Sequence, residues 1–295
     1  PPTTTNMGST NCGNREMSIV RAVSKLNLYL RVLGELPNGY HEIETLFLPL
    51  TTPSDELEIT FRDDGKGEFE IRSDVPLPTG RDNLCGKAAD AVCSALGIRP
   101  SISVNLRKRI PVAAGMGGGS SDAAALLLAV QERYGFLPDR GAAVALSCGA
   151  DVPFFLDPRP SVGRGLGERL TPLDGIAEPP ILILPMPFPI STPWSYRHLV
   201  RTEDNRSIDD LIAALRKRDY EQAAHFLRND LSEAAWRKFP LLTLAKNRLE
   251  ELGALGVQIT GSGPTLFALF AEESSRSGAA EELRRNPLPY SRPIL

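Results

Sequence analysis

The chain has 295 residues, of which 42% are hydrophobic and 23% are charged, close to the composition of an average globular protein. This length allows two domains of ordinary size. The 33 basic and 36 acidic residues give a formal net charge of −3, which argues against a nucleic-acid-binding protein because such proteins usually carry a basic excess.

The four cysteines contain no C-x-x-C pair, which excludes the common zinc and redox motifs and suits a reducing cytoplasm. The longest apolar stretch, 179–190, is interrupted by prolines and is shorter than the roughly 20 residues that a spanning helix needs. Residues 1–16 lack the apolar region of a signal peptide. We therefore expect a cytoplasmic protein without a membrane partner, with a disordered lead before Met17.

Residues 19–33 alternate in polarity and predict a strand. One face of this strand would carry Leu26, Leu28, Leu30 and Val32, and the other Lys25, Asn27, Tyr29 and Arg31. Further strands are predicted at 41–50, 56–62, 67–71 and 101–106, and a helix at 82–96. The turn at 63–65 predicts that 56–62 and 67–71 pair as a hairpin.

The second half of the chain begins with a glycine-dense loop at 111–119, which opens into an Ala/Leu-rich helix at 120–134. Further helices are predicted at 140–147, 208–217, 220–227 and 239–252, and strands at 180–186, 257–260 and 265–270. Early strands followed by helices, without strict βαβ alternation, indicate an α+β fold. A change in composition at 157–160 predicts a boundary between domains at 17–158 and 159–285, followed by a poorly ordered tail.

The glycine-dense loop is the strongest functional signal in the chain. Its glycines allow close approach of the backbone to a ligand and positive φ angles. The helix that follows directs its unpaired N–H groups and positive dipole end at the loop, which makes an anion-binding site. The residues of this segment that would bind the anion are Pro111, Ala114, Gly115, Met116, Gly117, Gly118, Gly119, Ser120 and Ser121. It is not a Walker A motif, because no Gly-Lys-Ser/Thr follows.

The run Gly117-Gly118-Gly119-Ser120-Ser121-Asp122-Ala123 resembles the second motif of the GHMP kinases, a family named for galactokinase, homoserine kinase, mevalonate kinase and phosphomevalonate kinase. Within that family it is most similar to the members that phosphorylate an erythritol bearing a cytidine diphosphate. The resemblance runs from about Ser18 to Phe270, with the motifs in the expected order. It implies a ribosomal protein S5 domain 2-like N-terminal domain and a ferredoxin-like C-terminal domain.

The resemblance also implies a catalytic Lys and Asp, which match Lys25 and Asp151. An aspartate can accept the alcohol proton or orient the hydroxyl, and a lysine beside it would keep it ionised. Read alone, a lysine on a strand is usually a solvated cation and an aspartate before a turn is usually a cap. Asn27 lies on the face of Lys25 and would orient the acceptor.

The remaining site residues also follow from the resemblance. Tyr40 and His41 would grip the cytidine, with core packing and a surface histidine as the alternatives. The substrate-binding set is completed by Thr192, Tyr196, Gly261, Ser262 and Asp151, with Trp194 as an alternative stacking ring. Asn83 would contact the adenine, with an N-cap role as the alternative, and Ser121 is a candidate Mg²⁺ ligand.

The sequence therefore predicts a kinase that uses ATP and Mg²⁺ to phosphorylate the 2-hydroxyl of a small substrate carrying a cytidine diphosphate, for isoprenoid precursor synthesis. It would act without nucleic acid, as a monomer or weak homodimer. The alternatives are a GHMP kinase with another alcohol substrate, a non-catalytic binding protein of the same fold, and an ATP-dependent decarboxylase of the same superfamily. The presence of both Lys25 and Asp151 argues against the binding protein.

Overall fold

The computed structural model describes residues 15–135, 141–200, 205–288 and 293–294, and the chain forms two compact units. Unit 1 contains the residues up to Ser24, Pro53–Val112 and Gly117–Pro158; unit 2 contains Lys25–Thr52, Ala113–Met116 and the residues from Arg159. The long strands β1 (Arg15–Glu35) and β2 (His41–Arg62) and the glycine loop each contribute to both units. The division into units therefore does not follow a single boundary at 157–160, because these three segments each belong partly to unit 1 and partly to unit 2.

Unit 1 contains a sheet whose order differs from the predicted hairpin. Strand β4 (Ser101–Arg107) pairs antiparallel with Glu56–Arg62 of β2, and β3 (Phe69–Ser73) pairs parallel with β4. The prediction that residues 67–71 pair directly with 56–62 is therefore wrong. Strand β4 takes the place between them because its alternating side chains, Ile102, Val104 and Leu106, are buried.

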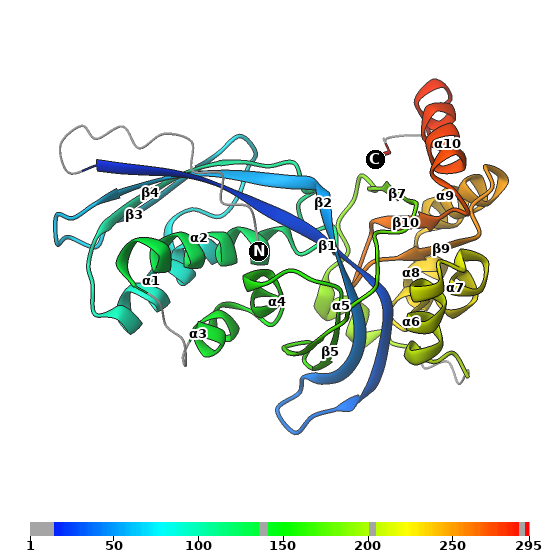
Figure 1. Cartoon of the computed structure of the whole chain (residues 1–295), viewed down its shortest axis with the longest axis horizontal. Helices are drawn as coiled ribbons and strands as arrows, with labels where there is room; N and C mark the ends of the chain where they lie inside the picture. Colours follow the sequence, from blue (N-terminus) through cyan, green and yellow to red (C-terminus); the bar gives the residue numbers. More distant parts are fainter. Residues whose placement is uncertain (1–14, 136–140, 201–204, 289–292, 295) are drawn as a thin grey trace. The chain divides into compact units, whose positions relative to one another are not determined.

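Helices cover one face of this sheet. The elements are the 3₁₀ turn Gly80–Asp82, α1 (Leu84–Leu96), α2 (Gly118–Tyr134), α3 (Gly141–Cys148) and α4 (Val152–Leu156). Helices α1 and α2 lie beneath β2, β4 and β3 (Figure 1). Small buried residues of α2, such as Ala123 and Ala124, allow close packing of its first turns.

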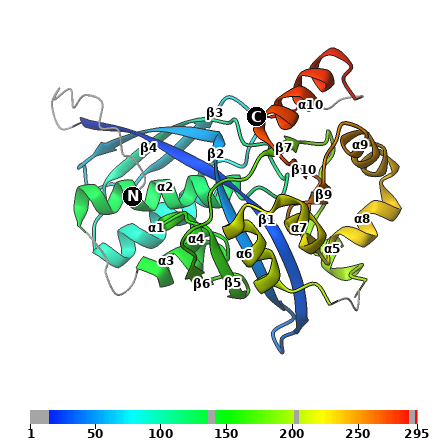
Figure 2. The same cartoon turned by 45° about the vertical axis from the view of Figure 1, so that its right-hand side comes forward.

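Unit 2 has a second sheet of three antiparallel strands, in the order β7 (Ile181–Leu184), β10 (Leu266–Leu269), β9 (Gly256–Ile259). Its helices are α5 (Thr192–Arg197), α6 (Ile208–Lys217), α7 (Tyr220–Phe226), α8 (Ser232–Lys238), α9 (Pro240–Glu251) and α10 (Glu273–Arg285). A buried apolar cluster joins this sheet to α8, α9 and α10, which lie around it in Figure 2. The short strands β5 (Ser161–Gly165), β6 (Arg169–Pro172) and β8 (Arg228–Asn229) pair with β2, β5 and β1 respectively.

Several sequence predictions are corrected by the structure. The strands predicted at 41–50 and 56–62 form one continuous strand, β2. Residues 24–30 are buried on both faces of β1 rather than alternately, because other elements cover each side. Strand β1 begins within the predicted lead, of which residues 1–14 lie outside the described part, and α10 ends at Arg285, where the predicted tail begins. Among the described residues, no helix is long and apolar enough to span a membrane.

Candidate active site

Lys25 lies on β1 in unit 2 with only 4% of its surface exposed. Its ammonium nitrogen donates a hydrogen bond to Asn27 Oδ1 at 2.5 Å and lies 5.5 Å from the centroid of the Phe47 ring. A buried ammonium is costly unless hydrogen-bonded, so these contacts fix the position of the charge. Lys25 is thus not the solvated surface cation that its residue type alone suggests.

Asn27 belongs to a chain of hydrogen bonds along the same strands. Its Nδ2 donates to Thr45 Oγ1 at 2.8 Å, and the Thr45 hydroxyl donates to the Tyr29 carbonyl at 2.6 Å. The side chain of Asn27 is therefore held at both ends, by Lys25 and by Thr45. In this structure it orients the lysine, while its predicted contact with the acceptor stays a prediction.

Three predicted segments meet within unit 2: the strand that carries Lys25, the glycine loop, and the turn that carries Gly261 and Ser262. The backbone N–H of Lys25 donates to the Met116 carbonyl at 3.1 Å, which joins the strand to the glycine loop. The N–H of Asn27 donates to Thr260 Oγ1 at 3.0 Å, which joins the strand to the turn after Thr260. Thr260 Oγ1 also lies 3.4 Å from the Gly115 carbonyl oxygen. Residues that are up to 233 positions apart in the sequence thus form one local cluster.

Asn229 is a member of this cluster that the sequence did not reveal. It lies on β8, paired with Leu30 of β1, and its Nδ2 donates to the carbonyls of Ile259 and Gly261, each at 2.7 Å. These bonds fix the turn that carries Ser262. The sequence gives little indication of this role, because a short polar run such as Arg228-Asn229-Asp230 is usually exposed. All three residues are buried in the tertiary structure.

The predicted cytidine-binding residues occur in two groups in unit 2. The rings of His41 and Tyr196 stack with centroids 4.7 Å apart and an interplanar angle of 25°. Thr192 and Ser262 share a hydrogen bond of 2.9 Å between their hydroxyls. Tyr40 is 62% exposed, which removes the alternative of core packing. The stacking role of these rings in substrate binding stays a prediction.

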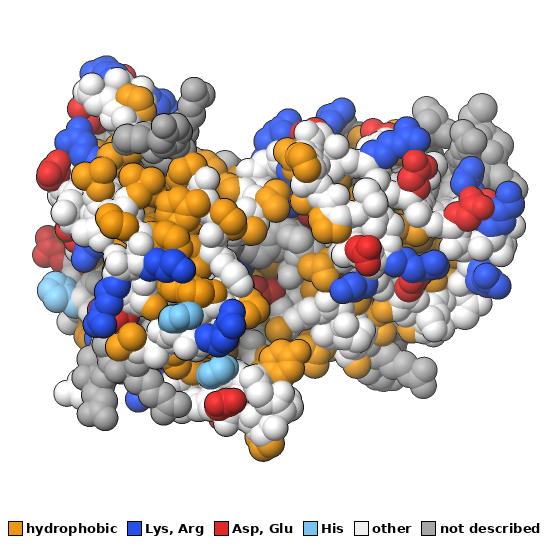
Figure 3. All heavy atoms as spheres, turned by 180° about the vertical axis from the view of Figure 1, so that it is seen from behind, with side chains coloured by type: hydrophobic (Ala, Val, Ile, Leu, Met, Phe, Trp, Pro, Cys, Tyr) orange, Lys and Arg blue, Asp and Glu red, His pale blue; other side chains and the backbone are white. Residues whose placement is uncertain are grey.

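Trp194, the alternative stacking ring, is engaged within unit 2. It stacks on the His198 ring at 4.6 Å, and the ammonium of Lys238 lies 4.5 Å from its centroid. It also packs against the apolar core. On the face of the molecule drawn in Figure 3, hydrophobic, histidine and basic side chains gather in the left-hand part, a mixture suited to stacking a base and pairing a phosphate.

In unit 1, the glycine loop leads directly into α2. Gly117 is the N-cap, with φ of 74°, and Gly118 begins the helix. Gly119 is exposed, so backbone N–H groups of the first turn are accessible, as an anion site requires. Ser121 is 2% exposed whereas Ser120 is half-buried, so Ser120 is the more accessible of the two hydroxyls.

Ala113, within the same loop but in unit 2, has a φ of 53°. A left-handed backbone costs an alanine roughly 1–2 kcal/mol, so the surrounding structure must hold the loop in this form. The loop is therefore a defined structure and not a flexible linker.

Asp151 precedes α4 in unit 1. Gly149, two residues earlier, lies next to the start of α2: a Cβ placed on it would be 4.0 Å from Ser120 Oγ. The loop that carries Asp151 is thus beside the N-terminus of α2.

Asn83 is the N-cap of α1, since its Oδ1 accepts the Cys85 N–H at 2.9 Å and its Nδ2 donates to the Pro78 carbonyl. The alternative N-cap role is therefore present, and the adenine contact stays a prediction.

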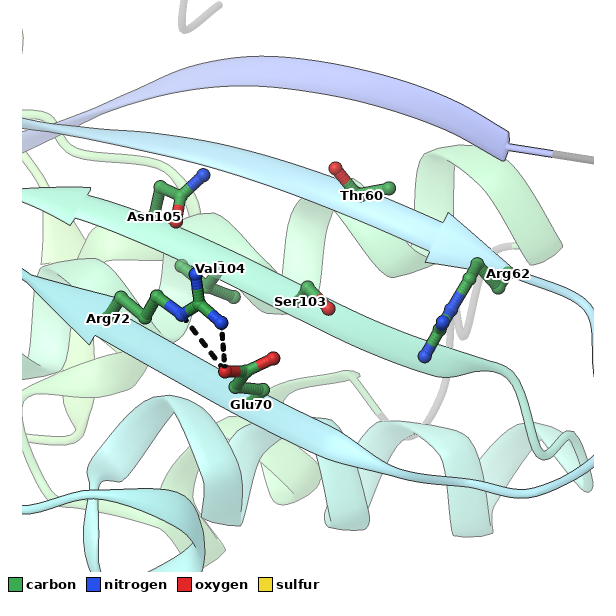
Figure 4. A pocket seen from close by; sticks show the side chains of 7 residues that line it. All are labelled: Thr60, Arg62, Glu70, Arg72, Ser103, Val104 and Asn105. Atoms are coloured by element: carbon green, nitrogen blue, oxygen red, sulfur yellow. Dashed lines mark hydrogen bonds and ion pairs between the residues drawn. The ribbon is translucent and has the colours of Figure 1, made fainter. Parts of the chain in front are cut away.

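A polar hollow of about 370 Å³ lies elsewhere in unit 1, on the sheet face opposite α1 and α2. Figure 4 shows its side chains on β2, β3 and β4, with Arg72 paired to Glu70. It contains no predicted site residue. Among the described residues, no three His, Cys, Asp or Glu side chains form a metal-binding group.

Two protein-family models match the chain: the GHMP kinases N-terminal domain over residues 83–157 and the GHMP kinases C-terminal model over residues 211–288. The chain belongs to the GHMP kinase family. It is therefore an ATP-dependent small-molecule kinase with the two-domain α+β fold that the sequence predicts.

Within this family the chain is similar to 4-diphosphocytidyl-2-C-methyl-D-erythritol kinases. The protein of that name from Geobacter sulfurreducens is 37% identical over 270 residues, which are 90% of this chain and 94% of the relative. A crystal structure of 4-(cytidine 5'-diphospho)-2C-methyl-D-erythritol kinase is 36% identical, with a TM-score of 0.77 and coverage of 93% of this chain and 97% of that one. Homoserine kinase from Cytophaga hutchinsonii, at 17% identity and a TM-score of 0.74, shares the fold.

Proposed function

We propose that the chain transfers the γ-phosphoryl group of ATP to the 2-hydroxyl of 4-diphosphocytidyl-2-C-methyl-D-erythritol. The observation that carries this proposal is the similarity over nine-tenths of the chain to relatives of that name. The stacked His41 and Tyr196 rings support it, because a substrate with a cytidine offers a flat base to stack on. The reaction would supply a phosphorylated intermediate for isoprenoid synthesis.

In the proposed mechanism, the loop from Gly115 to Ser121 holds the triphosphate through backbone N–H groups at the start of α2. Asp151 accepts the proton of the substrate hydroxyl or orients it for attack. Lys25, held by Asn27, offsets the negative charge that develops on the transferring phosphoryl group.

Mg²⁺ would neutralise charge on the ATP phosphates. Magnesium in kinases is usually held by substrate phosphates, waters and one or two protein oxygens. The glycine loop offers the hydroxyls of Ser120 and Ser121 for this purpose. Ser121 remains the proposed ligand, with Ser120 as the more accessible neighbour.

We propose that the enzyme acts in the cytoplasm as a monomer or weak homodimer. Its slight acidic excess, 36 acidic against 33 basic residues, gives no reason for a nucleic-acid partner.

An ADP-release assay against the cytidyl-erythritol, mevalonate, homoserine and galactose tests the proposed substrate. We expect turnover with the cytidyl-erythritol alone, without release of CO₂. The variant Tyr196→Ala should raise the KM for this substrate about tenfold, since a base–aromatic stack contributes about 1–3 kcal/mol, while Tyr196→Phe keeps the ring and the KM. Turnover of another alcohol at equal kcat/KM, or an unchanged KM in Tyr196→Ala, would contradict the cytidine assignment.

A further inference from the structure

Three charged side chains form a buried cluster in unit 1. Lys108 follows β4, Asp55 lies on β2, and Asp122 lies in the second turn of α2. The Lys108 ammonium is 2.5 Å from Asp55 Oδ2 and 2.8 Å from Asp122 Oδ2, and the three residues are 9%, 0% and 3% exposed. Burying a charge costs several kcal/mol per ion unless ion pairs and hydrogen bonds offset this cost. A buried charged cluster is therefore a candidate for a functional role.

The cluster contacts the chain at both ends of the glycine loop. Asp55 Oδ1 accepts the backbone N–H groups of Arg109 at 2.5 Å and Ile110 at 2.8 Å, immediately before the loop begins at Pro111. At the other end, a Cβ placed on Gly118 would lie 3.1 Å from the Lys108 ammonium. The entry and exit of the loop are therefore both fixed by the same charged group.

The cluster has one more carboxylate than it has cations, and Asp122 Oδ1 is buried without a hydrogen-bond partner. Burial, with the nearby Asp55 carboxylate, raises the pKa of Asp122 to about 7, against the opposing effect of Lys108.

We propose that Asp55, Lys108 and Asp122 are positioning residues for the phosphates of ATP, because they hold the two ends of the glycine loop in place at the start of α2. This inference rests on the proposed binding of ATP at that loop. Removing one of these side chains would free an end of the loop and displace the backbone N–H groups that would bind the phosphates.

The test compares Asp122→Asn, Lys108→Met and the exposed control Arg72→Met with the wild type, each with saturating Mg²⁺. Asp122→Asn weakens the ion pair with Lys108 and should raise the KM for ATP, by less than Lys108→Met does. Lys108→Met should raise the KM for ATP at least tenfold, and no variant should change the KM for the alcohol. Arg72→Met should match the wild type throughout.

Calorimetric titration with a non-hydrolysable ATP analogue separates this inference from the proposed reaction, because it requires no alcohol. A wild type that binds the analogue but phosphorylates no cytidyl-erythritol would refute the proposed substrate and leave the cluster testable by affinity. An unchanged affinity for the analogue in both Lys108→Met and Asp122→Asn would overturn the inference. An equal loss of affinity for both substrates in Asp122→Asn would also overturn it, because this variant keeps the shape of the side chain and should affect the ATP site alone.

Discussion

Replacing Gly115 with alanine should disable the glycine loop without touching any proposed catalytic side chain. Gly115 has a φ of +79°, and a Cβ on it would lie 2.2 Å from the Thr260 carbonyl oxygen and 3.1 Å from the Gly263 nitrogen. Both neighbouring atoms are backbone, so the overlap cannot be relieved by rotating a side chain. The loop or the Thr260 turn would have to move by about 1 Å to restore ordinary contact.

The cost can be worked out from this geometry. A left-handed φ costs a residue with a Cβ roughly 1–2 kcal/mol. Moving Thr260 would also break its hydrogen bond to the Asn27 N–H, at about 1 kcal/mol. The total of about 2–3 kcal/mol corresponds to a factor of about 30 to 150 in an equilibrium constant. We therefore expect kcat/KM for ATP to fall at least about 30-fold, because the loop and the strand that carries Lys25 shift together.

The matched control is Gly34→Ala on β1, the strand that carries Lys25. No atom lies within 4 Å of a Cβ placed on Gly34, and its φ lies outside the left-handed region. Steady-state ADP release should be unchanged in this variant, and urea unfolding checks that both variants are folded. If Gly115→Ala retained more than a third of the wild-type kcat/KM, the claimed contact between the glycine loop and the Thr260 turn would be refuted.

Three further predictions concern other parts of the site. Asp151→Asn should lower kcat by at least 100-fold, the usual contribution of general base catalysis, with analogue binding unchanged in calorimetry. Asn229→Leu should lower the free energy of unfolding in urea by about 2–4 kcal/mol, because the buried carbonyls of Ile259 and Gly261 lose their donor, and an effect below 1 kcal/mol would contradict the role given to Asn229. Burial raises the pKa of Asp122 to about 7, so its carboxyl stabilises the fold below about pH 4, and this contribution is lost as pH rises to 7. The fall in Tm over this range should therefore be smaller in Asp122→Asn than in the wild type.

The local parts of the structure could be predicted from the sequence, because local chemistry determines them. The glycine loop and α2 agree with expectation since glycines permit a positive φ and the Ala/Leu run favours a helix. Asn83 caps α1 for the same kind of reason, since its side chain reaches an N–H two residues ahead. These features involve partners within a few residues.

Pairing between distant strands could not be predicted in this way. The turn at 63–65 favoured a hairpin, but β4, which comes some 30 residues later, lies between the two strands. Residues 56–71 alone do not indicate that a later strand will pair with both β2 and β3. The choice depends on burying the apolar face of β4, which is a property of the assembled sheet.

The buried polar residues of the site were missed for a related reason. Lys108 and Asn229 are residue types that usually lie on the surface, and their sequence neighbours give no sign that each would find its partners 14 to 53 and 30 to 32 positions away. A polar group can be buried only where those distant partners satisfy it, so its burial reports the tertiary structure and not the local sequence. This gives a physical criterion for further site residues in the chain: polar side chains that are almost fully buried and that bond to the backbone of a functional loop. Asp55 meets that criterion through its bonds to Arg109 and Ile110, although Asp55 lies outside every motif that the sequence offered.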